Sequence, residues 1–127
     1  MIRYGLIVAC GLLITLTAVE AKTLNGSQTM ATARGKAMVD SQGMTLYTFD
    51  EDKNGQSACG FFCSYVWPPL KVSASTQGLV HWSVVDRGLG SAQATYKGHP
   101  LYTYAKDSKP GDVNGDGVDG TWHIARP

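Results

Sequence analysis

Gly43-Met-Thr-Leu-Tyr-Thr-Phe49, with Asp52 just after it, returns 55 residues later as Gly98-His-Pro-Leu-Tyr-Thr-Tyr104, with Asp107 just after it. Trp67 returns as Trp122 at the same offset. Self-similarity at one fixed period indicates two copies of a single supersecondary unit, each covering a face that the other cannot bury alone. The sequence therefore predicts a duplicated scaffold. We expect a pseudo-two-fold axis that places Leu46 and Leu101 in equivalent positions and both tryptophans in matching environments.

Short β-rich segments surround each copy of this repeat. Residues 36–39, the turn 40–43 and residues 45–49 form a predicted hairpin, and residues 93–96, 97–98 and 101–104 form its copy. Another strand is predicted over residues 79–85, and short closing strands near both tryptophans. No window keeps a helical period for long. The predicted fold is all-β, with two tandem hairpin-based repeats forming one small sandwich or barrel-like domain.

A period of two along the first hairpin places Tyr47 with Phe49 on one face and Leu46 with Thr48 on the other. The second copy repeats the pattern. The aromatic side chains either pack as core around the tryptophans or form a platform that stacks sugars or another flat ligand. Core packing is favoured because aromatic residues dominate the cores of small β domains. The Asp that follows each Tyr is then a ready hydrogen-bond acceptor for it.

The N-terminus reads as an export signal. Met1-Ile-Arg3 is followed by an apolar run from Tyr4 to Val19, and Val19-Glu20-Ala21 fits a small-x-small cleavage site. We expect a signal peptide over residues 1–21, cleaved near Ala21, and a periplasmic or secreted mature protein without a transmembrane segment. Residues 22–34 are small and polar and predict a disordered lead-in. One β domain over residues 35–127 follows, with repeats at about 35–78 and 79–127.

The charge balance restricts the partners. The chain has 11 Lys and Arg against 10 Asp and Glu, a net charge of +1. This balance offers no basic stripe for nucleic acid and no polybasic patch for lipid headgroups. We expect a monomer whose partner is an envelope component or a small ligand of unknown identity.

Two cysteines remain after the signal peptide is removed. Cys59 and Cys63 form an even pair in an oxidising compartment, which predicts a structural disulfide that shapes the turn before Trp67. The alternative is a redox or metal-binding dithiol. Thioredoxin-type sites use Cys-x2-Cys and zinc sites usually need four ligands, so the structural disulfide is favoured.

These spacings resemble a known family. The two Tyr-x4-Asp units, Cys59-x3-Cys63 before Trp67-Pro-Pro-Leu70, and Gly120-Thr-Trp-His are similar to the bacterial secreted-repeat lipoprotein family, over Gly35 to Pro127. That family is defined by its Tyr-x4-Asp repeat and has no established biochemical function. Where it tends to show Arg-x-Asp-Gly before the second repeat, this chain has Asp86-Arg87-Gly88-Leu89-Gly90. The resemblance implies an exported protein without implying an activity.

An acidic stretch carries the most specific chemical pattern. Asp112, Asn114 and Asp116 occupy positions 1, 3 and 5 of a calcium-loop template, and Gly117 follows at the bend. Position 12 is His123 in place of a bidentate Glu, so Asp119 or a backbone carbonyl would have to complete a looser Ca²⁺ site. The alternative is a long turn that uses the same side chains for backbone hydrogen bonds.

Two other chemistries have less support. Soft-metal or haem binding would draw on scattered residues, namely His81, His99, His123, Met38, Met44 and the two cysteines. A hydrolase would need paired carboxylates from Asp50, Glu51, Asp52 and Asp107, and no nucleophile motif accompanies them. We therefore expect no enzyme activity. The expected function is that of an exported non-catalytic binding or cell-envelope-associated module of unknown ligand, and the alternative is a periplasmic metal-handling or redox protein.

Overall fold

Short strands make up most of the regular structure. A computed structural model describes residues 28–73, 80–88 and 91–127. Among these residues no helix is long and apolar enough to cross a membrane. The elements, in chain order, are β1 (Gln28–Thr32), β2 (Gly35–Val39), β3 (Tyr47–Phe49), α1 (Cys63–Val66), β4 (Lys71–Ser73), β5 (Trp82–Gly88), β6 (Ser91–Tyr96), β7 (His99–Pro100), the 3-10 turn η2 (Val118–Gly120) and β8 (Trp122–Ile124).

Each repeat begins with an antiparallel hairpin. In the first repeat β1 pairs with β2 from Gln28 opposite Val39 to Thr32 opposite Gly35. In the second repeat β5 pairs with β6, and a bulge interrupts the register between Asp86 and Gly88. The prediction of a disordered lead-in over residues 22–34 is wrong for residues 28–32. Their side chains offer little to bury, but their backbone pairs with β2 along the whole strand. Residues 22–27 lie outside the described part.

Each hairpin is completed by the end of the other repeat. Leu46 donates its N–H to Met38 of its own hairpin and accepts from Ala125, which belongs to the second repeat. The copy is equivalent, because Leu101 donates to Ala94 and accepts from Leu70 of the first repeat. The expected equivalence of Leu46 and Leu101 is confirmed. What the sequence did not indicate is that the closing segments are exchanged between the repeats.

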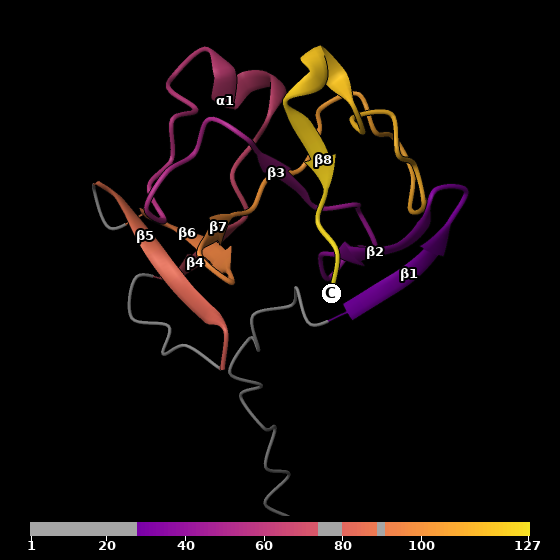
Figure 1. The fold of residues 1–127 in the computed structure, drawn as a ribbon, viewed down its shortest axis with the longest axis horizontal. Coiled ribbons are helices and arrows are strands. Elements are labelled where there is room, and N and C mark those ends of the chain that lie inside the picture. Colours follow the sequence, from indigo (N-terminus) through magenta and orange to yellow (C-terminus); the bar gives the residue numbers. More distant parts are fainter. Residues whose placement is uncertain (1–27, 74–79, 89–90) are drawn as a thin grey trace, which may run out of the picture.

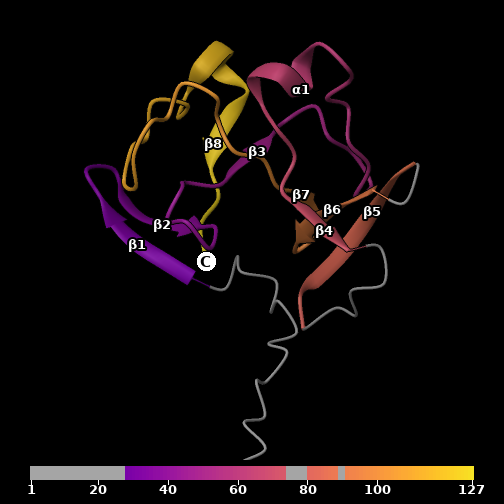
Figure 2. The same cartoon turned by 180° about the vertical axis from the view of Figure 1, so that it is seen from behind.

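The pseudo-two-fold axis passes between two equivalent tyrosines. The N–H of Tyr47 bonds the carbonyl of Tyr102 at 2.8 Å, and the N–H of Tyr102 bonds the carbonyl of Tyr47 at 3.0 Å. Around this pair the two starting hairpins lie on opposite sides, while α1 and the yellow segment that leads into β8 lie at the same end (Figure 1; the reverse view is Figure 2). The predicted all-β class and its two tandem repeats are confirmed, and the described sheets are small and do not close into a barrel.

Two buried clusters divide the core as the period of two predicts. Tyr47 and Tyr102 belong to one cluster, which we name the aromatic cluster and which also holds Ala37, Cys59, Trp67, Tyr104, Trp122 and Ile124. Leu46 and Leu101 belong to the other, which we name the aliphatic cluster although it includes Trp82, and which also holds Met38, Ala94 and Ala125. Tyr47, Tyr102, Leu46 and Leu101 all have 0% relative exposure. We name residues 46–49 and 101–104 the central strands. One face of each central strand packs in the aromatic cluster and the other face in the aliphatic cluster.

Candidate functional site

A stack of four aromatic rings occupies the centre of the first cluster. Trp67 and Trp122 lie face to face, with centroids 3.8 Å apart and planes 2° apart. Phe49 stacks on the outer face of Trp122 at 4.2 Å, and Tyr104 on the outer face of Trp67 at 4.2 Å. The two tryptophans are 4% and 3% exposed, so the interpretation as core is confirmed for them. The two tryptophan rings are therefore too buried to stack a sugar from solvent.

The tyrosine of each Tyr-x4-Asp unit forms a hydrogen bond with the aspartate of the other repeat. The hydroxyl of Tyr47 donates to Oδ2 of Asp107 at 2.6 Å, and the hydroxyl of Tyr102 donates to Oδ2 of Asp52 at 2.8 Å. The prediction that each tyrosine uses the Asp that follows it is therefore wrong. The central strands run antiparallel through the Tyr47 and Tyr102 bridge, so each ring points toward the loop of the opposite repeat.

The second oxygen of each carboxylate fixes the loop that follows it. Oδ1 of Asp52 accepts the N–H of Ala58, and Oδ1 of Asp107 accepts the N–H of Asn114. The pattern Tyr-x4-Asp thus joins the central strand of one repeat to the loop base of the other. Two equivalent loops result, which we name the disulfide loop (residues 57–66) and the acidic loop (residues 108–120).

Burial changes the acid–base properties of this network. Burial is the main cause that raises the pKa of Tyr47 and of Tyr102 well above the usual range, and the carboxylates that they face add to it. Burial likewise raises the pKa of Asp52, against the opposing effect of hydrogen bonds from Ala58 and Tyr102. The folded protein therefore favours neutral phenols at the centre of the repeat motif.

Alkaline titration should reveal two tyrosines that ionise only as the protein unfolds. Because their folded-state pKa is raised, their contribution to stability is complete below pH of about 10 and is lost as the pH rises towards the folded-state value. The free energy of unfolding should then fall by up to about 1.4 kcal/mol per pH unit for each tyrosine. Tyrosinate absorbance and circular dichroism, recorded together, measure this coupling.

The Tyr47→Phe variant is the control for this titration and should lose one of the two late-ionising groups. Full ionisation of all tyrosines near pH 10, with the circular dichroism of the folded protein unchanged, would contradict the expectation.

The disulfide loop carries exposed aromatic side chains. Cys59 and Cys63 are disulfide-bonded, as predicted, and Cys59 is buried in the aromatic cluster. The three rings that follow lie outside, with Phe61 71% exposed, Phe62 83% and Tyr65 68%. Phe61 packs edge to face against Phe62 at 5.4 Å and against Tyr65 at 5.2 Å. We name these three side chains the aromatic patch.

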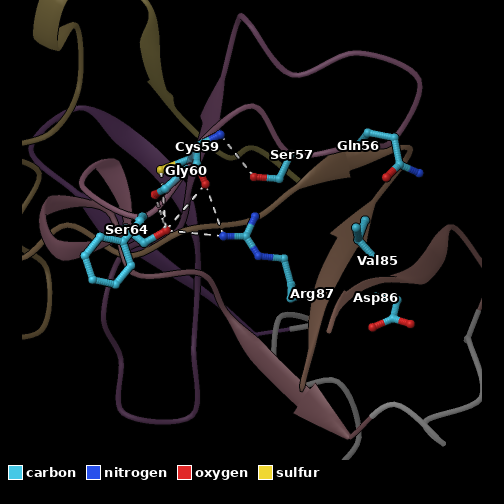
Figure 3. A pocket seen from close by; sticks show the side chains of 9 residues that line it. Gln56, Ser57, Cys59, Gly60, Ser64, Val85, Asp86 and Arg87 are labelled. Atoms are coloured by element: carbon cyan, nitrogen blue, oxygen red, sulfur yellow. Dashed lines mark hydrogen bonds between the residues drawn. The ribbon is translucent and has the colours of Figure 1, made fainter. Parts of the chain in front are cut away.

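Hydrogen bonds from the core hold the disulfide loop in place. The hydroxyl of Ser57 bonds the hydroxyl of Tyr102 at 2.7 Å and accepts the N–H of Cys59 at 3.2 Å. From β5, Nη2 of Arg87 donates to the carbonyl of Cys59 at 3.1 Å and to Oγ of Ser64 at 3.2 Å. These bonds connect the repeat motif to the base of the aromatic patch (Figure 3).

A hollow lies between the disulfide loop and β5. It has a volume of about 420 Å³, is open to solvent, and is lined by Gln56, Ser57, Phe61, Ser64, Asp86 and Arg87, among others. Arg87 reaches toward Cys59 and Ser64, whereas Asp86 points away from them (Figure 3). Asp86 instead accepts the N–H of Gly88. A guanidinium therefore faces the hollow directly beside the aromatic patch.

The acidic loop does not bring its predicted ligands together. Asp112 accepts the N–H groups of Ser108 and Lys109, which lowers the pKa of its carboxyl. Asp116 accepts the N–H of Ile124 and pairs with Arg34 at 3.3 Å.

The other two predicted Ca²⁺ ligands are exposed, and Asp119 has a left-handed φ of 53°. In the part of the chain that the structure describes, no group of three or more His, Cys, Asp or Glu could hold a metal ion. The carboxylates of Asp112 and Asp116 accept backbone N–H groups, as the alternative of a turn fixed by its own carboxylates requires, and Ca²⁺ binding by the loop stays a prediction.

The remaining candidates are dispersed. His123 pairs with Asp50 at 2.8 Å on the surface, and Met38 is buried in the aliphatic cluster. His81 and His99 are exposed, and Met44 is half-buried. Glu51 is exposed, Asp50 pairs with His123, and the carboxylates of Asp52 and Asp107 hold the loop bases. The positions of these side chains in the described part of the chain give no support to the soft-metal or the hydrolytic alternative.

Sequence reasoning missed the aromatic patch. The signal was present in Cys59-Gly-Phe-Phe-Cys63, because a five-residue disulfide-closed turn has no interior in which two phenylalanines could be buried. The prediction considered the aromatic residues of the two hairpins and the tryptophans, and it assigned no role to the phenylalanines between the cysteines.

The fold and its repeated Tyr–Asp links define a duplicated β module with two loops that differ in sequence. The family described as a secreted repeat of unknown function matches residues 28–71 and again residues 83–126, and the chain belongs to this family. The two matches are offset by the same 55 residues as the repeat itself. No curated protein and no solved structure matches at a significant level.

Proposed function

We propose that this protein is an exported, non-catalytic binding module of the cell envelope, and that the aromatic patch is its binding face. The observation that carries the proposal is the exposure of three neighbouring aromatic side chains in one short loop. Aromatic residues are enriched where proteins bind partners, and an exposed apolar cluster of this kind is a common mark of a binding site.

The construction of the loop supports this assignment. A disulfide closes its base, Ser57 ties it to Tyr102, and Arg87 ties it to β5. A loop held in one conformation loses less conformational entropy when it binds. The scaffold therefore presents the aromatic patch in a preorganised form, while membership of a secreted family supports export.

Export itself would use the leader at residues 1–21, with cleavage near Ala21. The intact mass of protein recovered outside the cytoplasm tests this step, because a chain starting at Lys22 is expected. A species that retains the leader would contradict it.

Sedimentation with purified envelope material tests the binding face. The Phe61→Ser plus Phe62→Ser variant should lose most of the cosedimenting protein, because both rings are removed from the patch. Its melting temperature should match that of the parent, since both side chains are exposed.

The Val80→Ser variant is the matched control, because Val80 is 81% exposed but lies outside the patch. It should sediment like the parent. Equal sedimentation of the double variant and the parent would reject the aromatic patch as the binding face.

A further inference from the structure

The hollow beside the aromatic patch has a chemistry of its own, and the inference drawn from it rests on the proposed function above. Arg87 uses Nη2 for the carbonyl of Cys59 and Oγ of Ser64. A guanidinium carries five N–H donors, so those on Nη1 and Nε remain. No protein acceptor for them is found among the described residues.

Charge in this region favours an anionic ligand group. No carboxylate of the described chain lies within ion-pair distance of Arg87. Asp86 also lines the hollow, but its side chain points away from Cys59 and Ser64 and accepts the N–H of Gly88, and Asp52 is engaged with Tyr102 and Ala58. The positive group that faces the hollow is therefore not neutralised by a direct partner, and a guanidinium binds carboxylates in a two-pronged geometry.

The lining combines this charge with aromatic and neutral polar groups. Phe61 belongs both to the hollow and to the aromatic patch, and Gln56 adds an amide to the opposite wall. A pyranose ring presents C–H groups on its faces and hydroxyls at its edges, so it can pack on an aromatic ring while it donates to polar neighbours. A single basic group is too little for a membrane surface, which attracts clusters of Lys and Arg.

We propose that the hollow and the aromatic patch together bind an acidic glycan, a chain of pyranose sugars that carries carboxylates. A uronate carboxylate accepts from Nη1 and Nε of Arg87. The adjoining sugars pack against Phe61, which lines the hollow, and against Phe62, which contacts Phe61 in the aromatic patch.

Calorimetric titration of the full mature protein with oligogalacturonate tests this assignment. The fully methyl-esterified form of the same oligosaccharide is the matched probe, because it keeps the sugar chain and removes the negative charge. The acidic form should bind at least about tenfold more tightly, since hydrogen bonds to charged groups are the stronger ones. Added salt should weaken the binding of the acidic form only.

Variants locate the binding site. Arg87→Gln should reduce the affinity for oligogalacturonate about tenfold or more, and Phe62→Ser severalfold. Lys36→Gln, which removes an exposed positive charge from β2, should leave the affinity unchanged. If Arg87→Gln disturbs the loop, the comparison of the two oligosaccharides on the parent protein still decides the question.

Three results would overturn the inference. They are equal affinity for the two oligosaccharides, no binding of either, or binding to phosphatidylglycerol vesicles in the absence of glycan binding. The last result would identify a lipid surface as the partner. In each case Phe61- and Phe62-dependent sedimentation with envelope material still reports separately on the proposed function.

Discussion

Trp122→Ala is expected to lower the free energy of unfolding by about 3 to 5 kcal/mol, the usual range for removing a buried tryptophan. The ring contacts both repeats, because it stacks on Phe49 at 4.2 Å and on Trp67 at 3.8 Å and meets Tyr102 edge to face at 5.1 Å. Domains of this size have a total stability of about 5 to 15 kcal/mol. The loss is therefore a large part of the total.

Urea denaturation followed by circular dichroism measures this loss without depending on tryptophan fluorescence. Trp122→Phe should cost distinctly less, because a smaller ring keeps part of the stack. Val80→Ala, at an exposed position, should stay within about 0.5 kcal/mol of the parent. A cost of Trp122→Ala below about 1 kcal/mol would contradict the central role of the stack.

The second large effect is expected at Asp107. Its carboxylate is 8% exposed and accepts from the hydroxyl of Tyr47 and the N–H of Asn114. Asp107→Ala leaves two donors without their acceptor, at a cost of about 1 to 3 kcal/mol for each buried group. The equivalent change Asp52→Ala should cost less, because Asp52 is only half-buried.

Double-mutant cycles test whether the partnership crosses the repeats. Tyr47→Phe and Asp107→Ala should couple by about 0.5 to 3 kcal/mol, because their side chains are bonded. Tyr102→Phe and Asp107→Ala, although neighbours in one Tyr-x4-Asp unit, should add within about 0.5 kcal/mol. The reverse pattern would falsify the exchanged arrangement.

The 55-residue period and the period of two predicted much of the fold. The first indicated two equivalent units, and the second assigned Tyr47 and Leu46 to different core clusters, as the structure shows. Both patterns are local or repetitive, so a single sequence contains them. They predict which side chains are buried and leave open which copy supplies their partners.

Pairing between distant segments could not be predicted in the same way. A duplicated chain contains two equivalent aspartates, one in each repeat, and nothing in the spacing distinguishes Asp52 from Asp107 as the partner of Tyr47. β1 was missed for a related reason, because the partner strand satisfies the backbone of Gln28–Thr32, whatever its side chains are. In the acidic loop, side chains with a metal-like spacing accept local backbone hydrogen bonds, and spacing alone does not distinguish that role from Ca²⁺ binding.

The exchange of closing segments has a consequence for how such a chain can be cut. A fragment holding one repeat would contain Leu46 without Ala125, and Tyr47 without Asp107, so the hydrogen bonds that cross between the repeats would lack their partners. Two copies of that fragment could supply those partners to each other, with Tyr47 of one copy facing Tyr47 of the next across a true axis. The single chain therefore has the arrangement of a symmetric dimer whose two subunits are joined by a peptide segment. Because the two repeats are parts of one chain, their equivalent loops can differ in sequence. The disulfide loop carries a disulfide and exposed aromatic rings, whereas the acidic loop is a turn held by its own carboxylates.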